Sequence, residues 1–180
     1  MRALVPLLFA FATAAPRLAT ATPEHPGLRG AGDMSAAAIG WRPAAGGDFQ
    51  GGAFKLTLGQ GTALLRGPLG ITSVTHGTFR MLDSSSYSLS PLGWMFLAHA
   101  NAGPVRFTSG FGASFLTMDI DHGNFSFGML SPKVIGALGY TFGRHTLEVR
   151  SDVEYDARFL QPDRVFISLG LALRVEVPVP

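Results

Sequence analysis

The chain has 180 residues, of which 47% are hydrophobic, and it contains no cysteine. The lack of cysteine excludes disulfides, thiolate metal sites and cysteine nucleophiles. Its 14 basic residues include Arg2 and Arg17, both within a predicted leader, so 14 − 2 = 12 basic residues face 12 acidic ones in the remainder. A nearly neutral mature chain does not favour a nucleic-acid partner.

The first residues have the order of a secretory signal peptide. Arg2 supplies a positive start, residues 3–15 are apolar except for Thr13, and the small residues Ala19-Thr20-Ala21 follow. This order predicts a signal peptide over 1–21 that is cleaved after Ala21. The apolar segment is too short to span a bilayer as a helix, which requires about 20 residues. An N-terminal anchor helix is the alternative.

The rest of the chain has the two-residue hydrophobic alternation of β-strands. Residues 22–33, rich in proline and glycine, predict a flexible tail before a barrel domain over 34–177, and 178–180 form a short C-terminal tail. No apolar run after the leader has the length of a membrane helix. Strands are expected at Met34–Arg42, Ala53–Gly59, Ile71–Met81, Tyr87–Ala100, Val105–Met118, Gly128–Phe142, His145–Phe159 and Arg164–Val177.

Eight strands joined by short turns favour an all-β fold, an antiparallel up-and-down barrel. Two connections are expected to be longer than turns. Residues 119–127 predict a polar loop, and 60–70 are too long for a periplasmic turn, which leaves the strand count uncertain there.

The composition of the polar faces decides which side of the barrel points inward. Outside the strand over 145–159 these faces carry mainly Gly, Ser, Thr and Ala, which fit a crowded lumen better than a water-facing exterior. The sequence therefore favours a transmembrane barrel with its apolar face toward lipid. The charged residues of the polar faces are predicted to form a structural ladder of internal salt bridges: Lys55, Arg80, Arg106, Lys133, Glu148, Arg150, Asp152, Glu154, Asp156, Arg158, Arg174 and Glu176.

The last third of the chain resembles the C-terminal hairpins of small eight-stranded bacterial outer-membrane barrels. The resemblance rests on residues 134–142, the charged strand that follows, and the strand over 165–177, and it is strongest over 128–177. It implies a fold and a location but no catalytic residues. One departure is the C-terminus, because such barrels usually end on an aromatic residue and this chain ends Val177-Pro178-Val179-Pro180.

Candidate chemistry is sparse. His122 with Ser126, or His145 with Ser151, are the candidate pairs for a lipid hydrolase, although no recognisable motif surrounds them. Asp119, Asp121 and His122 share a segment and are the candidate metal ligands. Neither set outweighs the simpler expectation of a protein with no catalytic residues, no metal and no cofactor.

The expected protein is a non-enzymatic outer-membrane barrel whose lumen is filled by side chains and whose external loops carry a structural or surface-interaction role. Its expected partners are outer-membrane lipid and the barrel assembly machinery, with an unknown surface partner. Two alternatives remain open: a lipid-modifying outer-membrane barrel enzyme, and a soluble periplasmic lipocalin-like barrel that binds an apolar ligand.

Overall fold

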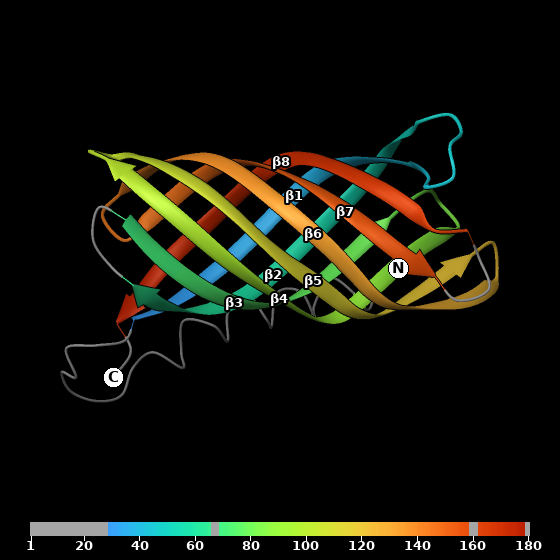
Figure 1. The fold of residues 1–180 in the computed structure, drawn as a ribbon, viewed down its shortest axis with the longest axis horizontal. Coiled ribbons are helices and arrows are strands. Elements are labelled where there is room, and N and C mark those ends of the chain that lie inside the picture. The colour runs from blue at the N-terminus through green and yellow to red at the C-terminus, as the bar shows by residue number, and fades with distance from the viewer. Residues whose placement is uncertain (1–28, 66–68, 159–161, 179–180) are drawn as a thin grey trace.

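Eight antiparallel strands form a closed barrel in the computed structural model, which describes residues 29–65, 69–158 and 162–178 (Figure 1). Each strand pairs with its neighbours in the sequence, and the first strand pairs with the last, so the sheet has no free edge. The predicted up-and-down topology and strand count are confirmed. The strands are β1 (Arg29–Pro43), β2 (Gln50–Leu65), β3 (Leu69–Met81), β4 (Ser86–Ala102), β5 (Val105–Asp121), β6 (Asn124–Phe142), β7 (His145–Arg158) and β8 (Arg164–Pro178).

The strands are longer than the alternation predicts. β1 begins at Arg29, so residues 29–33 belong to the barrel and not to the predicted tail over 22–33. The predicted signal peptide over 1–21 lies outside the described residues, as do 22–28. No helix that could cross a bilayer occurs in the described part of the chain.

The two connections predicted to be long are both shorter in the structure. The predicted polar loop over 119–127 is wrong, because β5 and β6 continue through it and only His122 and Gly123 form the turn. Both turn residues have positive φ, 50° and 86°, which allows a two-residue hairpin connection. Most of the segment 60–70 is also strand, since β2 runs to Leu65 and β3 begins at Leu69.

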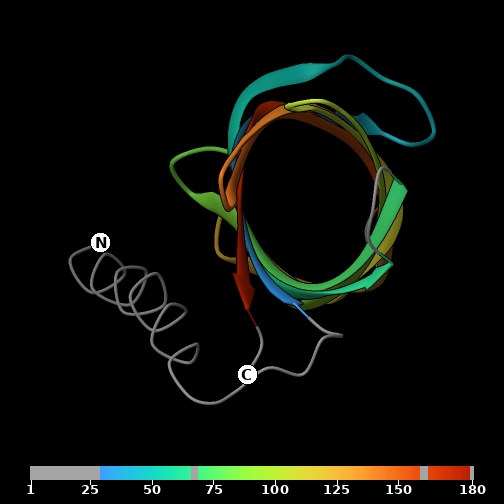
Figure 2. The same ribbon diagram turned by 90° about the vertical axis from the view of Figure 1, so that its left-hand side faces the viewer.

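The barrel has two different ends. The β2–β3, β4–β5 and β6–β7 connections lie at the end where β1 begins and β8 ends, here called the terminal end. The other four connections lie at the opposite end, here called the loop end, which includes residues 44–49 between β1 and β2 (Figure 1). The view from the terminal end shows the ring of strands closed all the way round (Figure 2).

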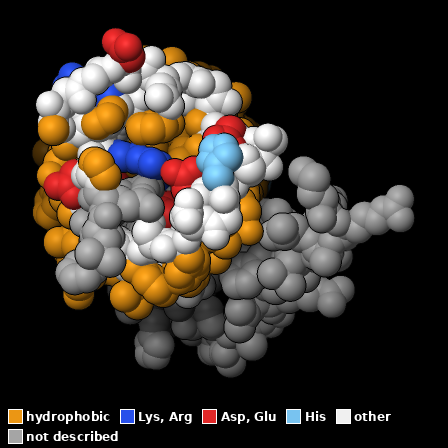
Figure 3. Space-filling model, turned by 90° about the vertical axis from the view of Figure 1, so that its right-hand side faces the viewer, with side chains coloured by type: hydrophobic (Ala, Val, Ile, Leu, Met, Phe, Trp, Pro, Cys, Tyr) orange, Lys and Arg blue, Asp and Glu red, His pale blue; other side chains and the backbone are white. Residues whose placement is uncertain are grey.

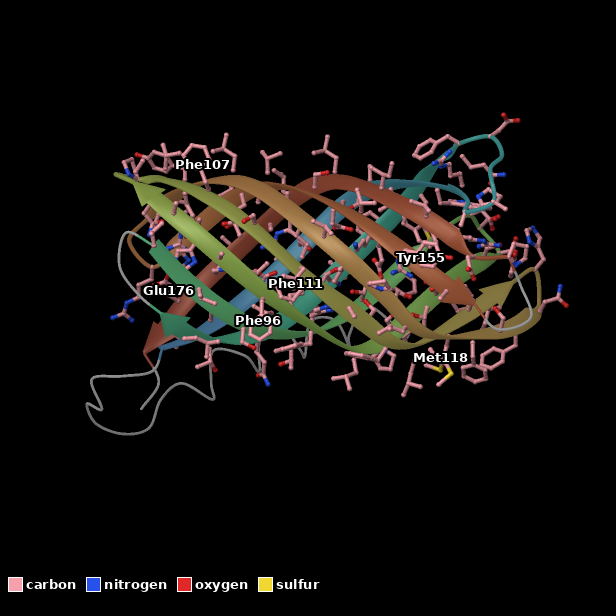
Figure 4. The ribbon with its side chains drawn as sticks, viewed as in Figure 1. Phe96, Phe107, Phe111, Met118, Tyr155 and Glu176 are labelled. Atoms are coloured by element: carbon pink, nitrogen blue, oxygen red, sulfur yellow. The ribbon has the colours of Figure 1, made fainter. Side chains whose placement is uncertain are left out.

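Large apolar side chains cover the outer wall. Phe107 on β5 projects outward with 54% of its surface exposed, and Figure 4 shows such side chains along the whole length of the barrel. Large apolar residues at alternate positions of β6, β7 and β8 are also exposed on the outer wall, with Val134 at 65% exposure. The period-two alternation therefore places the apolar face outside and the polar face inside, as the sequence predicts for a membrane barrel.

Part of the lumen is nevertheless apolar. The apolar face of β1, with Ile39, points inward, and Ile39 packs with Ala53 and Phe166. A second inward cluster is formed by Val74, Met95, Leu97 and Ile135. The lumen is therefore filled by two apolar clusters as well as by charges, and the prediction that the apolar face points toward lipid is wrong for β1.

Glycines make room for the larger lumenal side chains. A Cβ on Gly112 would lie 2.9 Å from the side chain of Met95, and one on Gly110 would lie 2.6 Å from Leu97. The ring of His76 lies against Gly93 in the same way. Large and small residues on neighbouring strands thus alternate to fill a narrow barrel.

Candidate functional site

Among the residues that the structure describes, twelve charged side chains are buried, and their charges balance. Six are basic and six are acidic, so their formal charges sum to zero. All point into the lumen from strands on different sides of the ring, which lets oppositely charged groups meet across it. The buried charged residues are Asp33, Lys55, Arg80, Arg106, Asp119, Lys133, Glu148, Arg150, Asp152, Glu154, Asp156 and Arg174.

The half of the lumen toward the loop end is organised around Glu154 on β7. The ammonium of Lys55 lies 3.3 Å from the Glu154 carboxylate and 2.6 Å from that of Asp152. Glu154 also pairs with the guanidinium of Arg80, which is fully buried and stacks over the ring of Phe166 at 4.7 Å. Buried Lys133 is the cross-strand neighbour of Glu154. Burial without such partners would cost several kcal/mol per charge.

The other half is organised around Asp33 on β1. The guanidinium of Arg150 donates to both oxygens of Asp33, at 2.7 and 2.8 Å. This bidentate geometry fixes the orientation of both side chains. Arg150 also donates to Glu148 at 2.8 Å, and Arg174 lies 3.4 Å from Asp33. Thr108 donates to the second oxygen of Glu148 at 2.9 Å.

A smaller pair lies close to the terminal end. Arg106 donates to Asn101 at 3.0 Å and to Glu176 at 3.2 Å. Glu176 is only partly buried, and Figure 4 shows it near that end of the barrel. The lumenal charges thus extend along most of the barrel axis.

Eleven of the twelve predicted ladder residues can be placed, and all eleven face the lumen. The exception is Arg158, which ends β7 and whose side chain lies outside the described part. The prediction missed Asp33, Asp119 and His76. Asp33 falls within the predicted tail over 22–33, although Ala31, Asp33 and Ser35 continue the period-two pattern of β1 and indicate that Asp33 faces the lumen.

A second polar cluster lies at the loop end, around the β5–β6 turn. Asp121 accepts hydrogen bonds from Ser86 at 2.8 Å and from Arg164 at 3.3 Å, and it pairs with His122 at 2.7 Å. The guanidinium of Arg164 lies over the ring of Trp41 at 4.2 Å. Figure 3 shows charged side chains gathered in this mouth, with hydrophobic side chains around its rim. Because His122 is bonded to the Asp121 carboxylate, its pKa is raised above the ordinary 6.5.

This cluster lacks the geometry of a catalytic triad. Ser86 and Asp121 both approach the same ring nitrogen of His122, Nδ1, at 3.3 and 2.7 Å. A triad needs the acid on one ring nitrogen and the nucleophile on the other, so that a proton can pass through the ring. The arrangement holds the turn in place and does not activate the Ser86 hydroxyl.

The structure does not bring the predicted catalytic pairs together. Ser126 is buried in the lumen, whereas the side chain of His122 is 68% exposed at the turn. His145 and Ser151 are six residues apart on one extended strand, a separation of about 20 Å. His145 instead stacks on Phe142.

The predicted metal ligands are also separated. Asp119 points into the lumen, whereas Asp121 and His122 lie at the turn. Within residues 29–65, 69–158 and 162–178, no three histidine, aspartate or glutamate side chains come close enough to hold a metal ion together.

No protein-family model matches the sequence, and no curated protein matches it. Among solved structures, the crystal structure of Neisserial surface protein A aligns with a TM-score of 0.65 and 17% identity, covering 83% of this chain and 98% of that one. The attachment invasion locus protein Ail of Yersinia pestis aligns with a TM-score of 0.49 and 12% identity, covering 82% and 99%. The predicted resemblance to small eight-stranded outer-membrane β-barrels is therefore confirmed at the level of the fold.

Proposed function

We propose that this chain is a non-enzymatic bacterial outer-membrane β-barrel that acts through its loop end, in a structural or surface-interaction role. The observation that carries the proposal is the distribution of side chains across the wall. Charged groups are buried inside and neutralise one another, while large apolar side chains cover the outside. A surface of this kind is stable against hydrocarbon and unstable against water.

The two alternatives lose support for different reasons. A lipocalin-like barrel in the periplasm needs an apolar interior and a charged exterior. The described interior instead holds twelve charged side chains beside its two apolar clusters, and the described exterior is mainly apolar. A lipid-modifying enzyme needs a nucleophile with a correctly placed base, and none of the described histidines is placed as such a base for Ser86, Ser126 or Ser151. The outer membrane and its assembly machinery remain the proposed partners.

Envelope fractionation is the first test. We expect the protein to sediment with the outer membrane and to run on a gel with a shift between unheated and boiled samples, because a closed barrel resists detergent until it is heated. Recovery of the protein in the soluble periplasmic fraction would contradict the proposal.

The orientation can be tested with single cysteines, since the chain has none of its own. The Asp48→Cys variant places a thiol in the exposed β1–β2 loop at the loop end, and the Arg144→Cys variant places one in the exposed turn between β6 and β7 at the terminal end. In intact cells a membrane-impermeant maleimide should label the first variant only. Disrupted cells should show labelling of both, and the reverse pattern in intact cells would place the terminal end outside.

A further inference from the structure

The outer wall has one cluster of polar side chains within its apolar band. Gln60 and Thr62 on β2 point outward beside Thr75 and Ser73 on β3, and the register pairs Gln60 with Thr75 and Thr62 with Ser73. These four residues are here called the β2–β3 polar patch. Elsewhere on the membrane-facing wall of the described strands, between the polar residues near the two mouths, outward polar side chains occur singly, as with Ser109 and Ser151.

Apolar residues lie on both sides of the patch along the same two strands. Toward the terminal end, Leu64 and Leu69 are 56% and 67% exposed. Toward the loop end, Phe54 and Met81 are also exposed. Because the patch is enclosed in this way, it lies within the band that faces hydrocarbon and not at the membrane surface.

The hydrogen-bonding groups of the patch are only partly used. The indole of Trp94 donates to the Ser73 hydroxyl at 2.7 Å. The Thr75 hydroxyl donates to the backbone carbonyl oxygen of Gln60 at 3.2 Å, which leaves the Gln60 side chain unused. The side-chain amide of Gln60 is exposed and bonds to none of the residues that the structure describes. An amide without a partner in hydrocarbon costs several kcal/mol.

We propose that the β2–β3 polar patch is the contact between two copies of this chain in the membrane. The inference rests on the proposed function, because it requires the wall to face lipid. Two barrels inserted in the same direction can be related by a two-fold axis along the membrane normal, which places identical residues opposite each other at the same depth. The Gln60 amide is both donor and acceptor, so two copies satisfy each other reciprocally.

The surroundings of the patch fit a second copy. The patch carries no charge, so a charged partner would have to be desolvated without compensation, whereas an identical patch offers neutral donors and acceptors. On β1, Gly32 pairs with Gln60 and Gly30 pairs with Thr62. These glycines have no side chain to hold the two walls apart.

Cysteine cross-linking in native membranes tests the contact. The Gln60→Cys variant places a thiol in the patch, and the Ser151→Cys variant is the matched control, because Ser151 is an outward polar residue on β7, on the opposite side of the eight-stranded ring. With a short bismaleimide, the first variant should give a product of twice the monomer mass that contains only this chain. The control should stay monomeric.

Several results would overturn the dimer. The dimer is contradicted if neither variant is cross-linked, if both variants are cross-linked to the same extent, or if the cross-linked product contains another protein. Recovery of the monomer in the outer-membrane fraction would leave the proposed function intact, whereas recovery in the soluble fraction would overturn both proposals.

A second pair of variants tests the amide itself. Thr75→Cys serves as the reporter, with and without Gln60→Leu, which removes the amide but keeps a side chain of similar size. The heat-dependent gel shift should be the same in both, which shows that both fold. The cross-linked fraction should fall about threefold or more with Gln60→Leu, the effect of roughly one hydrogen bond in a membrane. An unchanged fraction would contradict the role of Gln60.

Discussion

Asp33 is the residue on which one half of the lumenal ion-pair network depends. It is buried, it binds Arg150 through both oxygens, and it lies near Arg174. Replacing it removes one charge from the group and leaves two buried guanidinium ions without their shared carboxylate. Asp33 is therefore expected to matter more for stability than its place near the start of β1 suggests.

We expect Asp33→Asn to lower the free energy of unfolding by about 3–5 kcal/mol, the cost of removing one partner from a buried ion pair. Denaturant titration of the refolded barrel, followed by tryptophan fluorescence, measures the change. Asp48→Asn in the exposed β1–β2 loop is the control and should change the free energy by less than about 0.5 kcal/mol. Equal effects of the two substitutions would show that the Asp33 pairs are not stabilising.

His122 gives the β5–β6 turn a dependence on pH. Its bond to the Asp121 carboxylate raises the pKa of the imidazole above 6.5, so folding favours the protonated ring. The pair therefore stabilises the turn fully below the ordinary histidine pKa, and this contribution is lost as the pH rises through the raised value. NMR titration of the His122 ring should give a pKa above 6.5, and Asp121→Asn should lower it. An unchanged pKa in this variant would refute the pairing.

The sequence predicts the presence of the strands better than it predicts where they begin and end. Alternation identifies the inward charges of β7, because a strand must place every second residue on one face. It fails at residues 119–127, where polar side chains indicate a loop but Asp119 and Ser126 point into the lumen of two continuing strands. Polar composition distinguishes a loop from a strand only when the inward face of the strand packs on an apolar core. In this barrel the inward face lines a charged lumen, so a polar segment can also be a strand.

The same ambiguity explains the apolar face of β1. The pattern of Ala37, Ile39 and Trp41 is equally consistent with lipid and with an apolar cluster inside, and only the partners Ala53 and Phe166 on neighbouring strands decide between them. Contacts between residues this far apart in sequence are not encoded in local periodicity. The orientation therefore could not be predicted from Ala37, Ile39 and Trp41 alone, and only Asp33, on the same face of β1, indicates the lumen.

Two glycines in the strands test how closely neighbouring strands approach. A Cβ on Gly170 would lie 2.0 Å from the carbonyl oxygen of Ala36 and 2.4 Å from the Cα of Ala37, both backbone atoms of β1. A Cβ on Gly136 would meet nothing within 4 Å. We expect Gly170→Ala to lower the free energy of unfolding by about 1–3 kcal/mol or more, since the backbone must move.

Gly136→Ala is the matched control, and it should change the free energy by less than about 1 kcal/mol. Denaturant titration of both refolded variants gives the comparison. If Gly170→Ala were as stable as Gly136→Ala, the close approach of β8 to β1 would not be a constraint on the sequence.

Because side chains fill its lumen, we expect the barrel to have no pore. Eight strands enclose only enough space for side chains, and here Arg80, Glu154 and Phe166 occupy it together with the two apolar clusters. We expect no stepwise ion conductance when the purified barrel is inserted into a planar bilayer. Single-channel steps of defined size would contradict a side-chain-filled lumen, provided that a porin sample gives steps under the same conditions.

The pairing of β1 with β8 also constrains the order of events during biosynthesis. The two strands are in register from Arg29 with Pro178 to Pro43 with Arg164, and Arg174 reaches Asp33 across 141 positions of sequence. The first strand made must therefore wait for the last one before it gains its second neighbour, and contacts of such long range close slowly. The barrel therefore cannot close before the whole chain has been made, and the pairing of β1 with β8 is the contact that removes the last two free edges of the sheet.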